Sequence, residues 1–415
     1  MDMPLRSPFG LLLGLCLVAG GCIGNAGGTG TGAPNEPPPS SRPPDTVPLV
    51  TTDGARFVDR SGATVVLRGV DVHTLDPAVY TRAPALGVNF VRVAAPWSDY
   101  EPRPPSNGQH TWNVHRLAEL DRLISYCAAN RIQVLLDFHQ YGWSPFFAHV
   151  QRGGRANGMP RWLYAGRRFP ATLAGLDAAE ERFYTDRRAT SLYAGFAAMM
   201  AGRYRTSPNV LGYEILNEPA TGGARRTHAL TQRVVRWQAR ILDAIRAVDA
   251  ERTVVFMLRG GPSMGAQAAD LSPFGSLDHL ALDVHDYFAG TGGSGYKRDG
   301  ENVSFGYRST LQGLPYRGTA ASQADYLAVS LSAATRWNIP LMVGEWGAFN
   351  GRAGLRAYQR QMVSLFDAEG LSWARWSLDT RERLGLLTRA SSLRPAAEQL
   401  SELIARSAAP AASGG

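Results

Sequence analysis

Two glutamates, Glu218 and Glu345, are the residues of this chain whose type and setting are best suited to chemistry, because each ends or follows a run of apolar residues (209–219 and 340–347). A nearly continuous apolar run is typical of a parallel strand covered on both faces, and the functional polar residues of such folds stand at its carboxyl end. We therefore expect both carboxyl groups at one mouth of a parallel sheet. A proton donor paired with a nucleophile is what the cleavage of a glycosidic bond requires.

The elements that must position these glutamates recur regularly along the chain. Apolar runs of strand length cover residues 66–72, 90–95, 134–138, 210–216, 253–257, 280–284, 341–344 and 373–378. Helical patterns lie between most of them, and the clearest, 228–248, has an apolar face that includes Trp237. Eight repeats of strand then helix favour a closed (β/α)8 TIM barrel over an open doubly wound sheet. We predict one catalytic α/β domain, with an N-terminal β-hairpin (56–59 and 64–67) closing the barrel bottom.

The ends of the chain have a different composition from the barrel. Residues 9–18 are apolar but shorter than the about 20 residues that span a bilayer, as in a signal peptide. The stretch Ala19-Gly20-Gly21-Cys22 resembles a bacterial lipoprotein signal, which implies lipidation of Cys22; an ordinary cleaved signal is the alternative. We divide the chain into a signal peptide (1–22), a Pro/Gly/Ser/Thr-rich linker (23–48), the barrel domain (49–406) and a disordered tail (407–415). Either signal predicts an extracytoplasmic protein, lipid-anchored to a bacterial membrane or secreted.

Composition argues against several other classes of protein. The net charge is +8, but the basic residues are scattered arginines, with Lys297 as the only lysine, so we expect no nucleic-acid partner. The eight histidines contain no zinc-type pair, and calcium-type acidic clusters are missing, so we expect neither metal nor cofactor. Cys127 falls in a helical pattern and is expected to be a buried thiol. We expect a monomer.

Two long connections, 141–185 and 289–321, follow the third and sixth strands and are expected to form walls of the substrate site. Several aromatic residues in or near the first connection and the second glutamate fit either core packing or sugar stacking: Trp143, Phe146, Phe147, Trp162 and Trp346.

Short motifs at the strand ends together resemble glycoside hydrolase family 5, the cellulase family. They are residues 67–70, 89–92, 137–139, 217–219, 285–287 and 344–347, together with Trp376. Each is weak alone, but all occur in order on or at the end of a candidate strand. The resemblance implies a retaining glycosidase with Glu218 as acid/base and Glu345 as nucleophile. It further implies substrate-binding roles for a set of neighbours: Arg92, His139, Asn217, His285, Tyr287 and Trp376.

The chemistry sets requirements on the two glutamates. Glu345 must stay ionised and needs donors, for which Arg92 and the hydroxyl of Tyr287 are the candidates. Glu218 benefits from a raised pKa, which we expect the negative charge of Glu345 to provide. Structural roles stay open for single residues: Arg92 with Asp137 as an ion pair, His285 as a core histidine, and Trp376 as packing.

The substrate class is left open between related enzymes and a binding protein. The first hypothesis is an endo-acting hydrolase of a β-1,4-linked glucan or mannan. Segments 86–102, 134–140 and 158–163 resemble the endoglycoceramidase-like branch of the same family, which implies a glycolipid substrate. The third hypothesis is a non-catalytic surface protein that binds carbohydrate, against which the presence of both glutamates argues.

Overall fold

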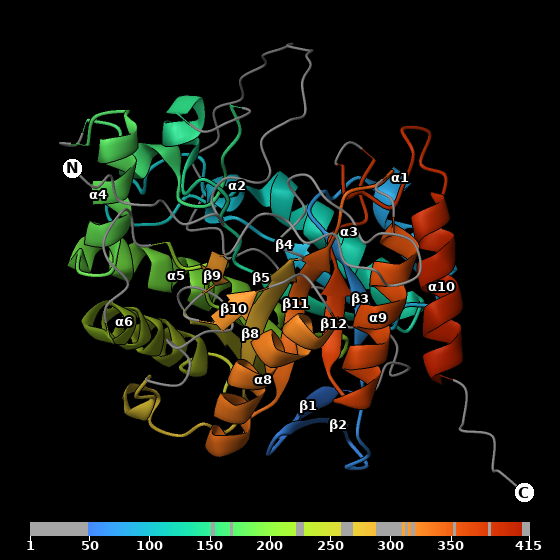
Figure 1. The fold of residues 1–415 in the computed structure, drawn as a ribbon. Coiled ribbons are helices and arrows are strands. Elements are labelled where there is room, and N and C mark those ends of the chain that lie inside the picture. The colour runs from blue at the N-terminus through green and yellow to red at the C-terminus, as the bar shows by residue number, and fades with distance from the viewer. Residues whose placement is uncertain are drawn as a thin grey trace, which may run out of the picture.

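The computed structural model describes residues 49–150, 154–166, 169–220, 228–258, 269–287, 309–311, 314–316, 320–351, 354–380 and 383–408. Eight parallel strands close into a barrel, and neighbours along the chain are neighbours in the barrel (Figure 1). The strands are β3 (Arg68–Val72), β4 (Phe90–Ala94), β5 (Gln133–Asp137), β6 (Val210–Glu214), β7 (Thr253–Met257), β8 (Leu280–Tyr287), β11 (Leu341–Gly347) and β12 (Ser372–Arg375). The predicted (β/α)8 fold is confirmed. The predicted signal peptide, the linker and Cys22 lie outside the described residues.

Helices surround the barrel (Figure 1). They are α1 (Pro77–Tyr80), α2 (Trp97–Tyr100), α3 (Val114–Ala129), α4 (Leu173–Phe183), α5 (Arg187–Tyr204), α6 (His228–Arg246), α8 (Ala320–Trp337), α9 (Leu355–Ala368) and α10 (Pro395–Ala408). The side chain of Asn113 caps α3 by accepting a hydrogen bond from the amide of Arg116. Leu117, Leu120 and Cys127 on one face of α3 are buried, which confirms the predicted buried thiol. Among the described residues, no helix combines the length and apolar character of a membrane span.

The N-terminal hairpin closes one end of the barrel as predicted, but its pairing differs from the prediction. β1 (Val50–Asp53) pairs with β2 (Arg56–Asp59), whereas residues 64–67 form no strand and contribute only an isolated bridge between Thr64 and Val58. Gly54, with a φ of 54°, makes the tight turn between β1 and β2. From the hairpin, Val50 and Phe57 pack into a buried cluster with inward residues near the strand starts: Leu67, Phe90, Leu135, Leu211, Val255, Ala281, Met342 and Ala374.

The strands that carry the candidate site run further than the sequence predicted. β8 continues to Tyr287 and β11 to Gly347, so that His285, Tyr287 and Glu345 lie on strands instead of in loops. A register shift between β11 and β8 comes just before Glu345. Such irregularities re-aim side chains, and this one lies next to the site.

The two long connections differ in how much of them is described. The first holds two short 3-10 helices, η3 (Pro145–Val150) and η4 (Arg161–Leu163), followed by α4. The second contains a small two-stranded sheet of β9 (Ser309–Leu311) and β10 (Leu314–Tyr316), and most of its other residues lie outside the described ranges. Two further 3-10 helices are η2 (Ala83–Leu86) and η5 (Ser272–Phe274). At the C-terminus, α10 continues to Ala408, so the first two residues of the predicted disordered tail are helical.

Candidate active site

Glu218 and Glu345 meet at the carboxyl ends of the barrel strands. One oxygen of each carboxylate lies within 4.8 Å of the other and of a ring nitrogen of His285. The side chain of Glu345 is only 6% exposed, while that of Glu218 is 43% exposed. The backbone at Glu218 has a φ of 37°, a conformation that residues other than glycine rarely adopt. One carboxyl group is therefore held deep in the barrel mouth, and the other remains open to incoming molecules.

His285 lies between the two glutamates. Its Nδ1 is 2.9 Å from Oε1 of Glu218 and 3.4 Å from Oε2 of Glu345. The ring is 3% exposed and lies on β8, one strand away from β11. A single imidazole nitrogen, Nδ1, thus lies close to both carboxylates.

Glu345 receives a hydrogen bond on each of its oxygens. Arg92 donates through Nη1 to Oε1 at 2.9 Å, and the hydroxyl of Tyr287 donates to Oε2 at 2.7 Å. These are the two donors named from the sequence. Donors to the charged form favour a carboxylate, so this pair opposes the cost of burying Glu345 as an anion.

Arg92 is the electrostatic centre of the barrel mouth and is 1% exposed. Its guanidinium nitrogens lie close to four carboxylates: Glu214 at 2.7 Å, Glu345 at 2.9 Å, Asp71 at 3.0 Å and Asp137 at 3.2 Å. Arg92 therefore makes both side-chain contacts expected from the sequence, one with Asp137 and one with Glu345. Burial raises the pKa values of Asp71 and Glu214 well above their usual range, although Arg92 lowers both. The charge of Arg92 thus opposes the effect of burial on both carboxyl groups.

The pKa order of the two central glutamates differs from the expectation that Glu345 would raise the pKa of Glu218. Protein around the carboxyl group raises the pKa of Glu218, but the hydrogen bond and charge of His285 outweigh this and leave it below the usual value. Burial raises the pKa of Glu345, against the lowering effects of His285 and Arg92, and the charge of Glu218 adds to the rise. The expectation for Glu218 was wrong because an imidazole lies between the two carboxylates.

The remaining predicted residues gather around this centre. Asn217 accepts a hydrogen bond from Arg92 at 2.8 Å and donates to the carbonyl of Gln140 at 2.9 Å. Nδ1 of His139 is 2.6 Å from Oδ2 of Asp137, and its ring stacks on Trp376 at 5.6 Å between centroids. Trp376, which follows β12, is 7% exposed. The structure therefore brings every predicted residue of the barrel mouth to the same edge of the sheet.

Comparison with known proteins identifies the family. The model of the cellulase family, glycosyl hydrolase family 5, matches residues 58–382. The chain belongs to glycosyl hydrolase family 5. As a family 5 member it is a glycoside hydrolase, and a retaining mechanism is typical of the family.

Relatives of this family 5 chain are similar over different extents. Endoglycoceramidase I of Rhodococcus hoagii (strain 103S) is 31% identical over 205 residues, which cover 43% of this chain and 39% of that protein. The crystal structure of an endogalactoceramidase shares the fold with a TM-score of 0.66 and 22% identity, over 86% of this chain and 85% of that chain. A β-glucanase from Saccharophagus degradans has a TM-score of 0.58 and 16% identity, over 89% of this chain and 98% of that chain.

The aromatic residues that fitted either packing or sugar stacking fall into two groups by burial. Trp143, Phe147 and Trp346 are fully buried in the main core of the family 5 barrel and pack against other rings. Phe146 and Trp162 are partly buried against the same core. The first three are therefore structural.

Three buried carboxyl groups of the site were not named as site residues from the sequence. Asp71 on β3, Glu214 on β6 and Asp283 on β8 all point into the barrel mouth of this family 5 chain, beside Arg92. A signal for Asp283 was present, because residues two apart on a strand share a face, and Asp283 precedes His285 and Tyr287 at that spacing. Glu214 similarly lies on the strand that leads to Glu218.

Two groups of side chains place three metal-ligating atoms close together in the described part of the family 5 barrel. One consists of Glu218, His285 and Glu345, and the other of Glu214, Asp283 and His285. Nε of Arg92 is 2.7 Å from Glu214 and 3.8 Å from Asp283. Nη1 of Arg92 is also 2.9 Å from Glu345 of the first group. Because this guanidinium already supplies positive charge to both groups, we assign a metal ion to neither.

Proposed function

We propose that the chain is a retaining endo-β-glycosidase in which Glu345 is the nucleophile and Glu218 the acid/base. The observation that carries this proposal is the approach of the two carboxylate oxygens to within 4.8 Å. Retaining enzymes hold the two carboxyl groups about 5–5.5 Å apart, whereas inverting enzymes leave about 6.5–9.5 Å for a water molecule. The short separation supports direct attack by a carboxylate on the sugar.

The surroundings of each glutamate support its proposed role. Glu345 is nearly buried and bonded by Arg92 and Tyr287, which suits an anion that attacks the anomeric carbon. As that bond forms, the bond to the leaving oxygen breaks, and Glu218 gives this oxygen a proton. In the second step Glu218 takes a proton from water, the water oxygen attacks the anomeric carbon, and Glu345 is released. The greater exposure of Glu218 gives leaving group and water access to it.

The neighbouring residues are proposed to bind the sugar. Asn217, fixed by Arg92 and by the carbonyl of Gln140, is placed beside Glu218 and would hold the hydroxyl next to the anomeric carbon. His139, oriented by Asp137, would bind another hydroxyl. Trp376 would contact the sugar with its remaining exposed surface, since His139 and His73 already stack on the ring.

For the substrate, we infer a glycolipid whose glycan is β-linked to a lipid aglycone. The support is the 31% identity over 205 residues to a protein named endoglycoceramidase I, in addition to the motif resemblance in the sequence. A β-1,4-linked glucan or mannan is the second candidate, because the matching family model is that of the cellulases. Both substrates require the same double displacement and differ in what occupies the leaving-group side.

A substrate panel tests the proposal. Wild type, Glu218→Ala and Glu345→Ala are assayed side by side on a glycosphingolipid, a soluble β-glucan and a mannan. Glycan release from the glycolipid supports the first candidate, and reducing ends from a polysaccharide support the second. Binding without turnover in every case would identify a carbohydrate-binding protein instead. With added azide, Glu345→Ala is expected to form a glycosyl azide of inverted configuration, whereas normal turnover of this variant without azide would refute its role.

We also propose that Cys22 is lipidated and anchors the enzyme to a membrane outside the cytoplasm. The support is the run of small residues directly before this cysteine. Mass spectrometry of the mature N-terminus from cells producing wild type and Cys22→Ser is the test. A lipid mass on wild type alone is expected, and an unmodified N-terminus elsewhere in the wild-type chain would indicate an ordinary cleaved signal.

A further inference from the structure

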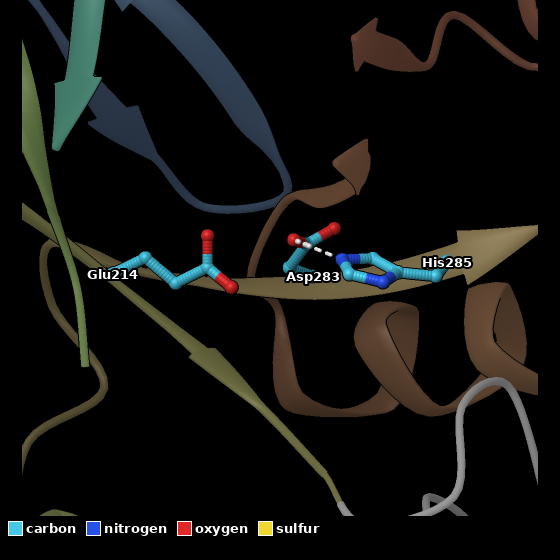
Figure 2. A group of neighbouring side chains, drawn as sticks. All are labelled: Glu214, Asp283 and His285. Carbon is cyan, nitrogen blue, oxygen red and sulfur yellow. Dashed lines mark ion pairs between the residues drawn. The ribbon is translucent and has the colours of Figure 1, made fainter. Parts of the chain in front are cut away.

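Asp283 is a buried carboxylate that the proposed reaction does not use. It lies on the same face of β8 as His285 and Tyr287 and is 0% exposed. Figure 2 shows its carboxylate paired with the ring of His285, and Glu214 lies on the side of Asp283 away from that ring. A charge of this kind is costly to bury without a partner, so its placement calls for an explanation.

The two oxygens of Asp283 have different partners. Oδ1 accepts a hydrogen bond from the amide of Gly344 at 2.6 Å. Oδ2 faces Nε2 of His285 at 3.5 Å. Among the described residues, neither Oδ2 of Asp283 nor Nε2 of His285 has a closer hydrogen-bond partner. A Cβ on residue 344 would lie 2.0 Å from Oδ2, so the carboxylate depends on glycine for its position. Gly344 therefore both holds Asp283 and leaves room for it.

We propose that Asp283 is a positioning residue that keeps Nε2 of His285 protonated, so that Nδ1 is the nitrogen that exchanges a proton with Glu218. This inference rests on the proposed function, in which Glu218 must donate a proton in the first step. It assigns the buried Asp283–His285 pair the task of supplying that proton.

The proton balance follows from the geometry. With Nε2–H held by Asp283, the charged imidazole carries its second proton on Nδ1, 2.9 Å from Oε1 of Glu218. Transfer along this hydrogen bond leaves a neutral imidazole and a protonated Glu218, which can then protonate the leaving oxygen. Burial opposes a charged His285, but Glu345, Asp283 and Glu218 together raise its pKa well above the usual value. In this proposal the resting site holds the proton on the histidine, in line with the lowering of the Glu218 pKa by His285.

Charged and titratable groups approach His285 from several strands of the barrel. They are Asp71 on β3, Arg92 on β4, Asp137 on β5, Glu214 on β6, Glu218 after β6, Asp283 and Tyr287 on β8, and Glu345 on β11. Asp283 forms an ion pair with Nε2 at 3.5 Å and an oxygen of Glu214 lies within 4.8 Å of a ring nitrogen, whereas Glu218 and Glu345 both face Nδ1. The identity of the protonated nitrogen therefore depends on Asp283.

Asp283→Asn tests this dependence with little change in shape. An amide has one oxygen, so it cannot accept hydrogen bonds from both Gly344 and His285, and with its oxygen on Gly344 its NH₂ faces Nε2. The variant thus favours a neutral His285 with its proton on Nδ1. Asp286→Asn is the matched control, because Asp286 is a fully buried carboxyl group on the same strand, and burial and a hydrogen bond with Gln323, not the two glutamates, shift its pKa.

The readout compares two leaving groups within one enzyme preparation, so that a partly folded variant does not distort the result. Phenyl β-lactoside needs a proton on its leaving oxygen, whereas 2,4-dinitrophenyl β-lactoside does not. General acid catalysis contributes about 10²–10⁴-fold, so we expect kcat for the phenyl substrate to fall about 100-fold in Asp283→Asn and far less for the dinitrophenyl substrate. The alkaline limb of the pH profile should move to lower pH, with KM little changed and Asp286→Asn like wild type.

Equal losses with both leaving groups and an unshifted pH profile would overturn the proposal and leave Asp283 a structural residue. Nitrogen-15 spectra of the histidines give a second test that needs no turnover, with His285 assigned from a His285→Gln sample. Nε2 of His285 should stay protonated throughout the neutral pH range in wild type and lose its proton in Asp283→Asn. An unprotonated Nε2 in wild type would refute the pairing, whereas lack of activity on both lactosides with Nε2 protonated would count against the proposed function alone.

Discussion

Removal of the Tyr287 hydroxyl is expected to separate the two steps of the proposed reaction. In wild type this hydroxyl donates to Oε2 of Glu345 at 2.7 Å. The first step consumes the negative charge of Glu345 as the glycosyl ester forms, and the second step restores it as the ester is cleaved. A donor to the charged carboxylate therefore assists the second step, so Tyr287→Phe should slow hydrolysis of the glycosyl-enzyme more than its formation.

The size of the effect follows from the kind of hydrogen bond that is lost. A hydrogen bond to a charged group contributes about 1.5–3 kcal/mol, and each 1.4 kcal/mol or so changes a rate about tenfold. Arg92 still holds Oε1 in the variant, so the carboxylate keeps one of its two donors. We expect hydrolysis of the glycosyl-enzyme to slow by about 10- to 100-fold, since the whole bond energy is the upper bound.

Rapid-mixing kinetics with 2,4-dinitrophenyl β-lactoside measure the two steps separately. Tyr287→Phe should release a burst of dinitrophenolate equal to the enzyme concentration and then turn over slowly, and intact-mass measurement should show an enzyme that carries a sugar. Tyr213→Phe is the matched control, because it also removes a buried hydroxyl that donates to a carboxylate, that of Asp249 at 2.8 Å, away from the site. A Tyr287→Phe enzyme with wild-type kcat and no accumulated ester would refute the reasoning.

Three other outcomes follow from the structure. Gly344→Ala should displace the Asp283 carboxylate, so it should lose activity on the phenyl lactoside more than on the dinitrophenyl lactoside and should lower stability by about 1–3 kcal/mol, measured by urea unfolding. Burial raises the pKa of Asp286 to about 8, so the folded chain binds a proton there that the unfolded chain has released; stability should fall as pH rises from about 4 to 8, and Asp286→Asn should flatten that slope in a series of melting curves. Burial also raises the pKa of the Cys127 thiol to about 12, so peptide-level mass spectrometry should find this cysteine unlabelled by maleimide until the chain is unfolded.

The strand ends could be predicted from sequence because their pattern is local. A continuous apolar run followed by Asn217 and Glu218 carries the signature of a buried parallel strand by itself, and the same holds for the run before Glu345. The hairpin partner could not be predicted in this way. Asp59 forms a tight turn by accepting hydrogen bonds from the amides of Ser61 and Ala63, and this turn brings the chain back to β2 for a single bridge, too short a contact to form a strand. The competing strand, β1, lies upstream and was not recognised.

The pKa order of the glutamates depends on distances that no local pattern contains. From sequence, Glu218 and Glu345 were two like charges, and repulsion between them was assigned to Glu218. In the structure, His285 lies closer to Glu218 than to Glu345, at 2.9 Å and 3.4 Å, so its stabilising effect falls more on Glu218 and the repulsion falls on Glu345. In the proposed mechanism Glu218 must therefore gain a proton before the first step. A sugar that displaces water from Glu218 would disfavour its charged form, so that the proton would move from His285 to Glu218. Substrate binding itself would thus protonate the acid.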